Sequence, residues 1–103
     1  MRRPNDPGQV VARDEQVDAE WADFAHRLAV RLRQLRSNAG LSQEDVAYRA
    51  GLARYTYQRY EKGESRAGVP SNPPLRSLLA LARVLGVELA EMVPEPAPDL
   101  RVR

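Results

Sequence analysis

The sequence predicts a small all-α domain of five helices, with a first helix that is extended at its N-terminus. Three observations support this prediction. Apolar residues recur at steps of three and four from Asp14 to Asn38, a Gly separates two short helical stretches between Leu41 and Gly63, and a Leu-rich run over residues 75–85 ends at Gly86. With 103 residues, we expect one small domain with a modest core.

The composition excludes several kinds of site. With no Cys, the chain has no disulfide framework, thiolate metal site or Cys nucleophile. No run reaches the ~18 apolar residues of a membrane-spanning helix, and the first residues lack the apolar segment of a signal peptide. His26 has no carboxylate or second His at ligand spacing, so we expect no metal and no cofactor. Without an apolar span or a signal peptide, we expect a cytoplasmic protein with no membrane partner. Since no catalytic set or phosphate-binding Gly loop occurs, we expect that the protein is not an enzyme.

Positive charge is concentrated in the middle of the chain. Residues 1–26 contain three Arg and six acidic residues, a net charge of −3, whereas residues 27–67 contain eight Arg and one Lys against four acidic residues, a net charge of +5. A basic segment favours a polyanionic partner, but it also fits an Arg-rich helix face in contact with solvent. Charge alone leaves both interpretations open.

The N-terminal part is expected to consist of an arm and a long helix. Residues 1–13 contain two Pro and a Gly without a helical period, which predicts a disordered arm. An arm that carries Arg could reach into a minor groove or lie along phosphates. Asp14 is a suitable N-cap for a helix that continues to Asn38. The apolar stripe of this helix consists of Val17, Trp21, Phe24, Leu28, Leu32 and Leu35.

The first half of this helix exceeds what the domain needs. About 25 residues give a helix of roughly 37 Å, and a domain of this size needs only the second half. The large apolar side chains in the first half are Val17, Trp21 and Phe24. Two interpretations remain open: this half folds back over its own domain, or these side chains form a dimer contact with a second subunit.

Residues 42–61 predict a helix-turn-helix motif, in which two short helices are joined by a sharp turn. Ser42 can cap the first of these helices, with Asp45 completing a capping box. Gly51 lies where the chain turns, and a turn of this kind often requires a positive φ.

The second helix of the motif is expected over residues 54–61 and ends before Gly63. Tyr57 and Tyr60 are three residues apart and are expected to face the core. The opposite face carries side chains of the kinds that hydrogen-bond to base edges. These are Arg54, Tyr55, Gln58 and Arg59.

The segment that follows, residues 64–74, is rich in Pro, Gly and Ser and is expected to be a long loop. Asn72 and Pro73 fit the N-cap and first position of a fourth helix. That helix is expected to bury Leu75, Leu78, Leu79, Ala82 and Leu85.

The domain is expected to cover residues 14–93. A fifth short helix over residues 88–93 would add Leu89 and Met92 to the core. Residues 94–103 are Pro-rich and are expected to form a flexible tail.

Residues 41–63, with the downstream stretch LRSLLALARVLGVELAEMV, resemble the helix-turn-helix of the Cro/CI-like, or xenobiotic-response-element, family of transcriptional regulators. The matching features are the Leu-Ser-Gln opening at 41–43, Ala47, Gly51, apolar or aromatic residues at 46, 57 and 60, Glu-Lys-Gly at 61–63 and Leu-Gly-Val at 85–87. The resemblance covers residues 27–93 and implies a five-helix DNA-binding domain like that of the phage lambda repressor. The segment at 64–74 departs from it by being several residues longer.

The resemblance implies contacts with double-stranded DNA. Arg54, Tyr55, Gln58 and Arg59 match the base-reading positions of the family, although Tyr55 could instead pack on a neighbouring side chain. The side chains implied at the DNA backbone are Ser42, Gln43, Thr56, Lys62 and Arg66. Arg36 and Glu61 match a pair that in many members forms a partly buried ion pair between the first helix and the end of the third.

Two function classes follow. In the first, a sequence-specific DNA-binding transcriptional regulator, expected to be a repressor, inserts the helix 54–61 into the major groove. Two copies would form a homodimer on half-sites about 34 Å apart. In the second, the chain is an antitoxin or adaptor whose main partner is another protein, and DNA binding is secondary or autoregulatory. The basic and polar face of the helix 54–61 favours the first class, because an acidic or apolar face would favour the second.

Overall fold

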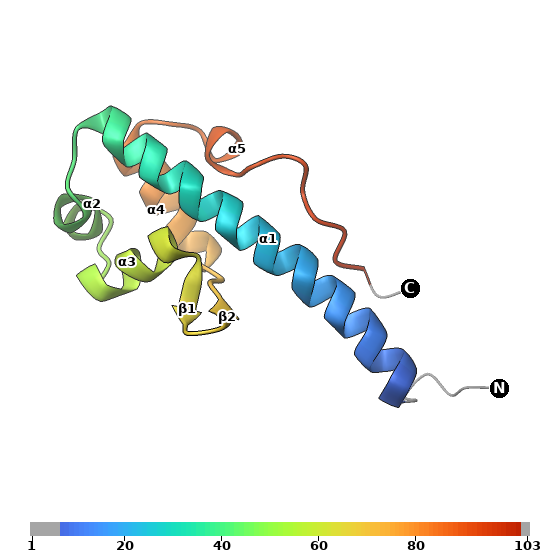
Figure 1. Cartoon of the computed structure of the whole chain (residues 1–103). Coiled ribbons are helices and arrows are strands. Elements are labelled where there is room, and N and C mark those ends of the chain that lie inside the picture. The colour runs from blue at the N-terminus through green and yellow to red at the C-terminus, as the bar shows by residue number, and fades with distance from the viewer. Residues whose placement is uncertain (1–6, 102–103) are drawn as a thin grey trace.

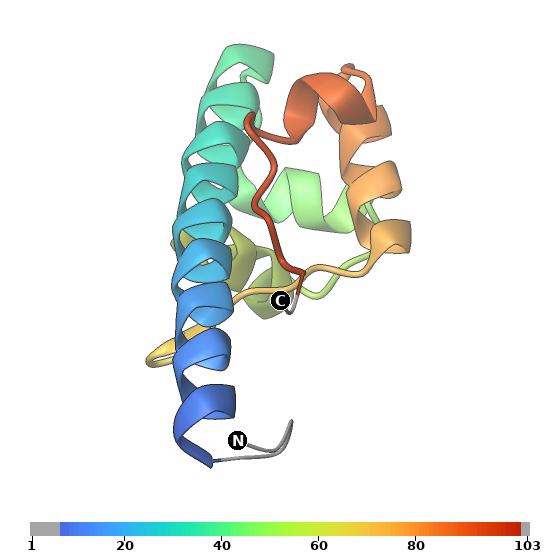
Figure 2. The same cartoon turned by 90° about the vertical axis from the view of Figure 1, so that its right-hand side faces the viewer.

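The computed structural model describes residues 7–101, which form a mostly helical domain with one small hairpin (Figure 1). The elements in chain order are α1 (Pro7–Ala39), α2 (Gln43–Arg49), α3 (Arg54–Lys62), β1 (Glu64–Arg66), β2 (Val69–Pro70), α4 (Leu75–Leu85) and α5 (Leu89–Met92). Helices α2 to α5 gather against the C-terminal half of α1, while its N-terminal half extends beyond them in both views (Figures 1 and 2). Within the described residues, no helix combines the length and apolar character needed to cross a membrane.

Helix α1 begins at Pro7, seven residues before the predicted N-cap Asp14. The prediction of a disordered arm is therefore wrong for residues 7–13, and residues 1–6 lie outside the described part of the chain. Pro fits the first helical position because its φ is already helical and its missing N–H is not needed there. No Pro or Gly follows Gly8 before the end of the helix to interrupt it.

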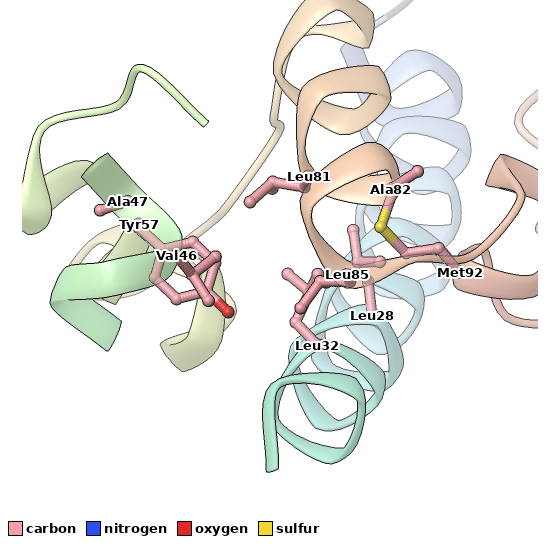
Figure 3. Close-up of a cluster of buried hydrophobic side chains, with 9 residues drawn as sticks. All are labelled: Leu28, Leu32, Val46, Ala47, Tyr57, Leu81, Ala82, Leu85 and Met92. Carbon is pink, nitrogen blue, oxygen red and sulfur yellow. The ribbon is translucent and has the colours of Figure 1, made fainter. Parts of the chain in front are cut away.

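The core lies between the C-terminal half of α1 and the shorter helices. Figure 3 shows Leu28 and Leu32 of α1 beside Leu85 of α4, with Val46 and Tyr57 facing them. Because removing apolar side chains from water is favourable, this cluster holds the helix-turn-helix against α1. Its buried members are Leu28, Leu32, Val46, Ala47, Tyr57, Leu81, Ala82, Leu85 and Met92.

Two predicted core residues of α4 lie on the surface. Leu75 is 61% exposed and Leu79 is 52% exposed, whereas Leu81, which was not among the predicted core residues, is completely buried. The buried face of α4 runs through Leu81, Ala82 and Leu85, and the first turn of the helix stands clear of the core. A Leu-rich helix carries apolar residues on more than one side, so its sequence does not identify the buried side.

The expected loop at residues 64–74 contains an antiparallel hairpin of β1 and β2, in which Glu64 pairs with Pro70 and Arg66 with Val69. The Glu64 carboxylate accepts a hydrogen bond of 2.8 Å from the backbone N–H of Gly68 in the turn. Strands of three and two residues are too short to show an alternating pattern in the sequence.

The predicted start of α4 at Asn72 and Pro73 is also wrong, because the helix begins at Leu75 with Pro74 as its N-cap. A residue that precedes Pro is disfavoured in the α region. Pro74 therefore keeps Pro73 out of the helix and moves its start towards the C-terminus.

The C-terminal segment after α5 runs back beside α1 (Figures 1 and 2). Pro94 is buried, and the Arg27 guanidinium donates a hydrogen bond of 3.3 Å to the carbonyl oxygen of Pro96. Phe24 is only 7% exposed, so it is buried within its own chain instead of being presented to a second subunit. Trp21 and Val17 are partly exposed, and the rings of Trp21 and Phe24 lie 5.7 Å apart. The first half of α1 is thus partly covered by its own chain.

Candidate nucleic-acid interface

The helix-turn-helix is fixed by local backbone chemistry. The Ser42 hydroxyl caps α2 by accepting a hydrogen bond of 3.0 Å from the backbone N–H of Asp45. Gly51 in the turn has φ of +71°, the positive value predicted for it. Gly63 ends α3 in the left-handed conformation. These three positions determine where the two helices begin and end.

A buried carboxylate joins α3 to α1. Glu61 is 3% exposed and accepts two hydrogen bonds from the guanidinium of Arg36. Arg36 Nε donates to Glu61 Oε2 at 2.6 Å, and Arg36 Nη2 donates to Glu61 Oε1 at 3.1 Å. The structure thus contains the predicted ion pair, with the two-pronged geometry that suits a guanidinium and a carboxylate. Arg33 also donates to the backbone carbonyl of Glu61, a contact that was not predicted from the sequence. Arg33 lies one helical turn before Arg36, and this spacing is the feature of the sequence that could have indicated the contact.

The surroundings of Glu61 favour its charged form. Burial by itself would raise the pKa of Glu61, but hydrogen bonds from Arg36 and Gln43 and the nearby Tyr57 hydroxyl outweigh it, so the pKa lies below its usual value. The hydrogen bond to Glu61 raises the pKa of Arg36. Burial raises the pKa of Tyr57, and the charge of Glu61 acts in the same direction. The Tyr57 hydroxyl does not meet hydrogen-bond geometry with Glu61 or with any other described residue.

The same carboxylate orients a side chain at the start of α2. Gln43 Nε2 donates a hydrogen bond of 2.9 Å to Glu61 Oε1, and Gln58 Nε2 lies 3.5 Å from Gln43 Oε1. An ionised carboxylate can only accept, so the amide nitrogen of Gln43 must face Glu61 and its oxygen must face Gln58. Gln43 is therefore part of a chain of polar contacts from the core to the outer face of α3.

The outer face of α3 gathers most of the predicted DNA-contacting side chains. Tyr55 is 62% exposed, and its hydroxyl accepts hydrogen bonds of 3.0 Å and 2.7 Å from Nε and Nη2 of Arg59. Arg54 at the start of the helix lies 3.9 Å from the exposed carboxylate of Glu44. A shallow hollow on this face is lined by Gln43, Tyr55, Gln58, Arg59 and Lys62.

Other predicted contact residues do not line this hollow. Thr56 is partly buried in α3, and Arg66 is exposed on the hairpin. The Ser42 hydroxyl is engaged as the cap of α2. Within the described residues, no group of three or more His, Asp or Glu side chains could hold a metal ion.

Comparison with known proteins identifies the family. The family model described as "Helix-turn-helix domain" matches residues 27–93, which is most of the chain. The chain belongs to the helix-turn-helix family. Within it, the chain is of the Cro/CI-like type of regulator, as its residue pattern indicated. The N-terminal half of α1 lies outside the matched region of this helix-turn-helix protein.

The chain is also similar to a transcriptional repressor of a cryptic phage. It is 37% identical over 70 residues to a Vibrio cholerae protein named cryptic phage CTXphi transcriptional repressor RstR. The aligned region covers 68% of this chain and 58% of the length of that relative. No solved structure matches the chain.

Proposed function

We propose that this helix-turn-helix protein is a sequence-specific DNA-binding transcriptional repressor that inserts α3 into the major groove. The observation that carries the proposal is the contrast between the two sides of α3. Tyr57 and Glu61 are buried on one side, while Arg54, Tyr55 and Arg59 stand outward on the other. A helix held rigidly from behind can present hydrogen-bonding side chains to base edges in a defined register.

The flanking side chains suit the phosphate backbone. Lys62, at the end of α3, lines the hollow on the outer face of this helix. Arg66 is exposed on β1, the strand that follows α3. The second amide hydrogen of Gln43 is available to a phosphate while the first binds Glu61. Ser42 would contribute through the start of α2, and Thr56 through the first turns of α3. These contacts would set the register on the duplex but would carry no sequence information.

The name of the Vibrio cholerae relative, a transcriptional repressor, supports repression as the regulatory outcome. We propose that two copies occupy a pseudo-palindromic site with half-sites about 34 Å apart. Trp21 and Val17 on the projecting half of α1 are the side chains that we assign to the contact between copies, and Phe24 supports them from within its own chain.

Selection of bound sequences from a random duplex pool tests the proposal, followed by binding titrations on the selected duplex and on random DNA. Arg59→Ala is expected to weaken binding to the selected duplex by about tenfold or more, the effect of one bidentate base contact, and to change random binding much less. Arg83→Ala, which removes an exposed charge from α4, is the matched control. Equal losses on both duplexes would show that Arg59 contacts phosphate instead of a base.

Sedimentation of the protein with the selected duplex tests the stoichiometry. We expect two chains per duplex, and Trp21→Ala is expected to reduce the cooperativity of binding without changing the helical content. One chain per duplex at saturation would exclude the arrangement on two half-sites.

A further inference from the structure

Two predicted base-reading residues, Tyr55 and Arg59, form hydrogen bonds with each other. They are four residues apart on α3, a spacing that places them next to each other on one face of the helix. The Tyr55 hydroxyl accepts from Nε at 3.0 Å and from Nη2 at 2.7 Å, and the guanidinium carbon lies 4.9 Å from the centre of the Tyr55 ring. The pair is thus held by hydrogen bonds and by a cation–π contact.

The hydrogen bonds use one edge of the guanidinium. A guanidinium has five N–H donors in a rigid plane. Nε and one hydrogen of Nη2 point to the Tyr55 hydroxyl, which leaves the other hydrogen of Nη2 and both hydrogens of Nη1 available. The two free donors at the end of the side chain are parallel, which matches the O6 and N7 acceptors of guanine in the major groove.

We infer that Tyr55 is a specificity-determining positioning residue, whose hydroxyl holds one edge of Arg59 so that the other edge is presented to a guanine. This inference rests on the proposed function, because it assigns a base and a geometry to the same face of α3. Arg is a long side chain with much rotational freedom, and fixing it before binding lowers the entropy lost when the base contact forms. Without the hydroxyl, Arg59 could turn to a phosphate, which carries no sequence information.

The position of Tyr55 supports this role over a contribution to folding. It is 62% exposed, and the buried aromatic residue of α3 is Tyr57, which fills the core. Removal of an exposed hydroxyl should therefore leave the fold intact. A change in DNA discrimination after this removal would then report on the recognition face itself.

Tyr55→Phe tests the inference because it keeps the ring and removes only the hydroxyl. The control is Tyr48→Phe, which removes the hydroxyl of an 85% exposed Tyr on α2. Affinities are measured for three DNAs: the selected duplex, random duplex, and selected duplexes in which single guanines are replaced by 7-deazaguanine, which lacks the N7 acceptor. Thermal unfolding checks that the variants are folded.

For wild type, 7-deazaguanine at one position of the half-site is expected to weaken binding by about tenfold. Tyr55→Phe is expected to weaken binding to the unmodified selected duplex by about fivefold and to reduce the 7-deazaguanine penalty to about twofold. Its affinity for random DNA should stay within about twofold of wild type, and Tyr48→Phe should match wild type on all three DNAs.

Two outcomes would overturn the inference while leaving the proposed function in place. A Tyr55→Phe variant that retains the full 7-deazaguanine penalty would show that Arg59 needs no positioning, and equal losses on selected and random DNA would make Tyr55 a backbone contact. Failure of the proposed function would look different, because wild type itself would then bind the selected and random duplexes equally.

Discussion

Arg36 and Glu61 form an ion pair of unequal burial: the side chain of Arg36 is 24% exposed, whereas that of Glu61 is 2% exposed. The guanidinium can be hydrated from one side if its partner is lost. The carboxylate cannot, because α1, α2 and α3 enclose it. Loss of Arg36 is therefore the more damaging of the two changes, since it leaves a buried charge with Gln43 as its remaining side-chain donor among the described residues.

We predict that Arg36→Ala lowers the free energy of unfolding by about 3–5 kcal/mol, as expected for a buried ion pair broken on one side. Glu61→Gln should cost less, because a neutral amide in the same place leaves no buried charge. In the Glu61→Gln background, Arg36→Ala should cost clearly less than it does alone. Denaturant unfolding of the four proteins measures this coupling, and strictly additive losses would show that the two side chains do not interact.

The lowered pKa of Glu61 predicts a loss of stability in acid. A carboxylate whose pKa is lower in the folded than in the unfolded protein stabilises the fold above its unfolded pKa, near 4.5, and this stabilisation is lost as the pH falls through the folded pKa. We expect the melting temperature of wild type to fall below about pH 4.5, and that of Glu61→Gln to fall less steeply. Parallel pH profiles for the two proteins would assign the acid sensitivity to other carboxylates.

The raised pKa of Tyr57 predicts a loss of stability at alkaline pH. Its pKa is raised by burial, so the neutral hydroxyl stabilises the fold below the usual tyrosine pKa of about 10, and stability falls as the pH rises above it. Tyr57→Phe should flatten this alkaline decline. At pH 7 it should change the free energy of unfolding by less than about 1 kcal/mol, because the buried hydroxyl lacks a hydrogen-bond partner within the described residues.

The control for Tyr57 is Tyr48→Phe, because Tyr48 is 85% exposed. Tyr48→Phe removes a hydroxyl that lies outside the core, so the decline in stability at alkaline pH should remain as in wild type. A large loss at pH 7 for Tyr57→Phe would indicate that the hydroxyl makes a stabilising contact, for example with Glu61.

Gly51 and Gly63 provide a matched pair for the cost of the helix-turn-helix turns. Both have positive φ, +71° and +77°. A Cβ on Gly51 would meet nothing within 4 Å, but a Cβ on Gly63 would lie 3.4 Å from the carbonyl oxygen of Ala25 and 3.5 Å from the Cβ of Ala29. Gly51→Ala should therefore cost about 1–2 kcal/mol from backbone strain alone.

Gly63→Ala should cost about as much as Gly51→Ala, because 3.4–3.5 Å is an ordinary van der Waals distance and the added methyl group fits against α1. Thermal unfolding of the two variants compares them directly. A clearly larger loss for Gly63→Ala would mean that the added methyl group forces α3 away from α1. Gly68→Ala in the hairpin, at φ of +77° and with open space around it, serves as a second reference for strain alone.

Local chemistry explains which parts of the fold could be predicted. The cap at Ser42 and the turn at Gly51 depend on residues next to each other in the chain, so their patterns are visible in the sequence. The hairpin at 64–70 and the delayed start of α4 at Leu75 were not predicted. The end of the hairpin is joined to the end of α3 by a backbone hydrogen bond of 2.9 Å from the N–H of Ser71 to the carbonyl of Gly63, a contact with no sequence signature.

The candidate site divides in the same way. The outward residues of α3 follow from helical periodicity, since residues 54, 55, 58 and 59 must share a face once 57 is buried. The contacts that these side chains make with one another do not follow from helical periodicity. The contact between Tyr55 and Arg59 depends on rotamers, and the orientation of Gln43 depends on Glu61, which is eighteen positions away in the chain.

By itself, the sequence determined the helix-turn-helix, its family and the outward face of α3, because capping residues, glycine turns and helical period act over a few positions. Only the tertiary structure decided that Phe24 is buried within its own chain, that Leu75 and Leu79 are exposed, and that Glu61 connects three helices. Burial depends on which distant segments meet, and a buried carboxylate then fixes the side chains around it, since it must be paired wherever water is excluded.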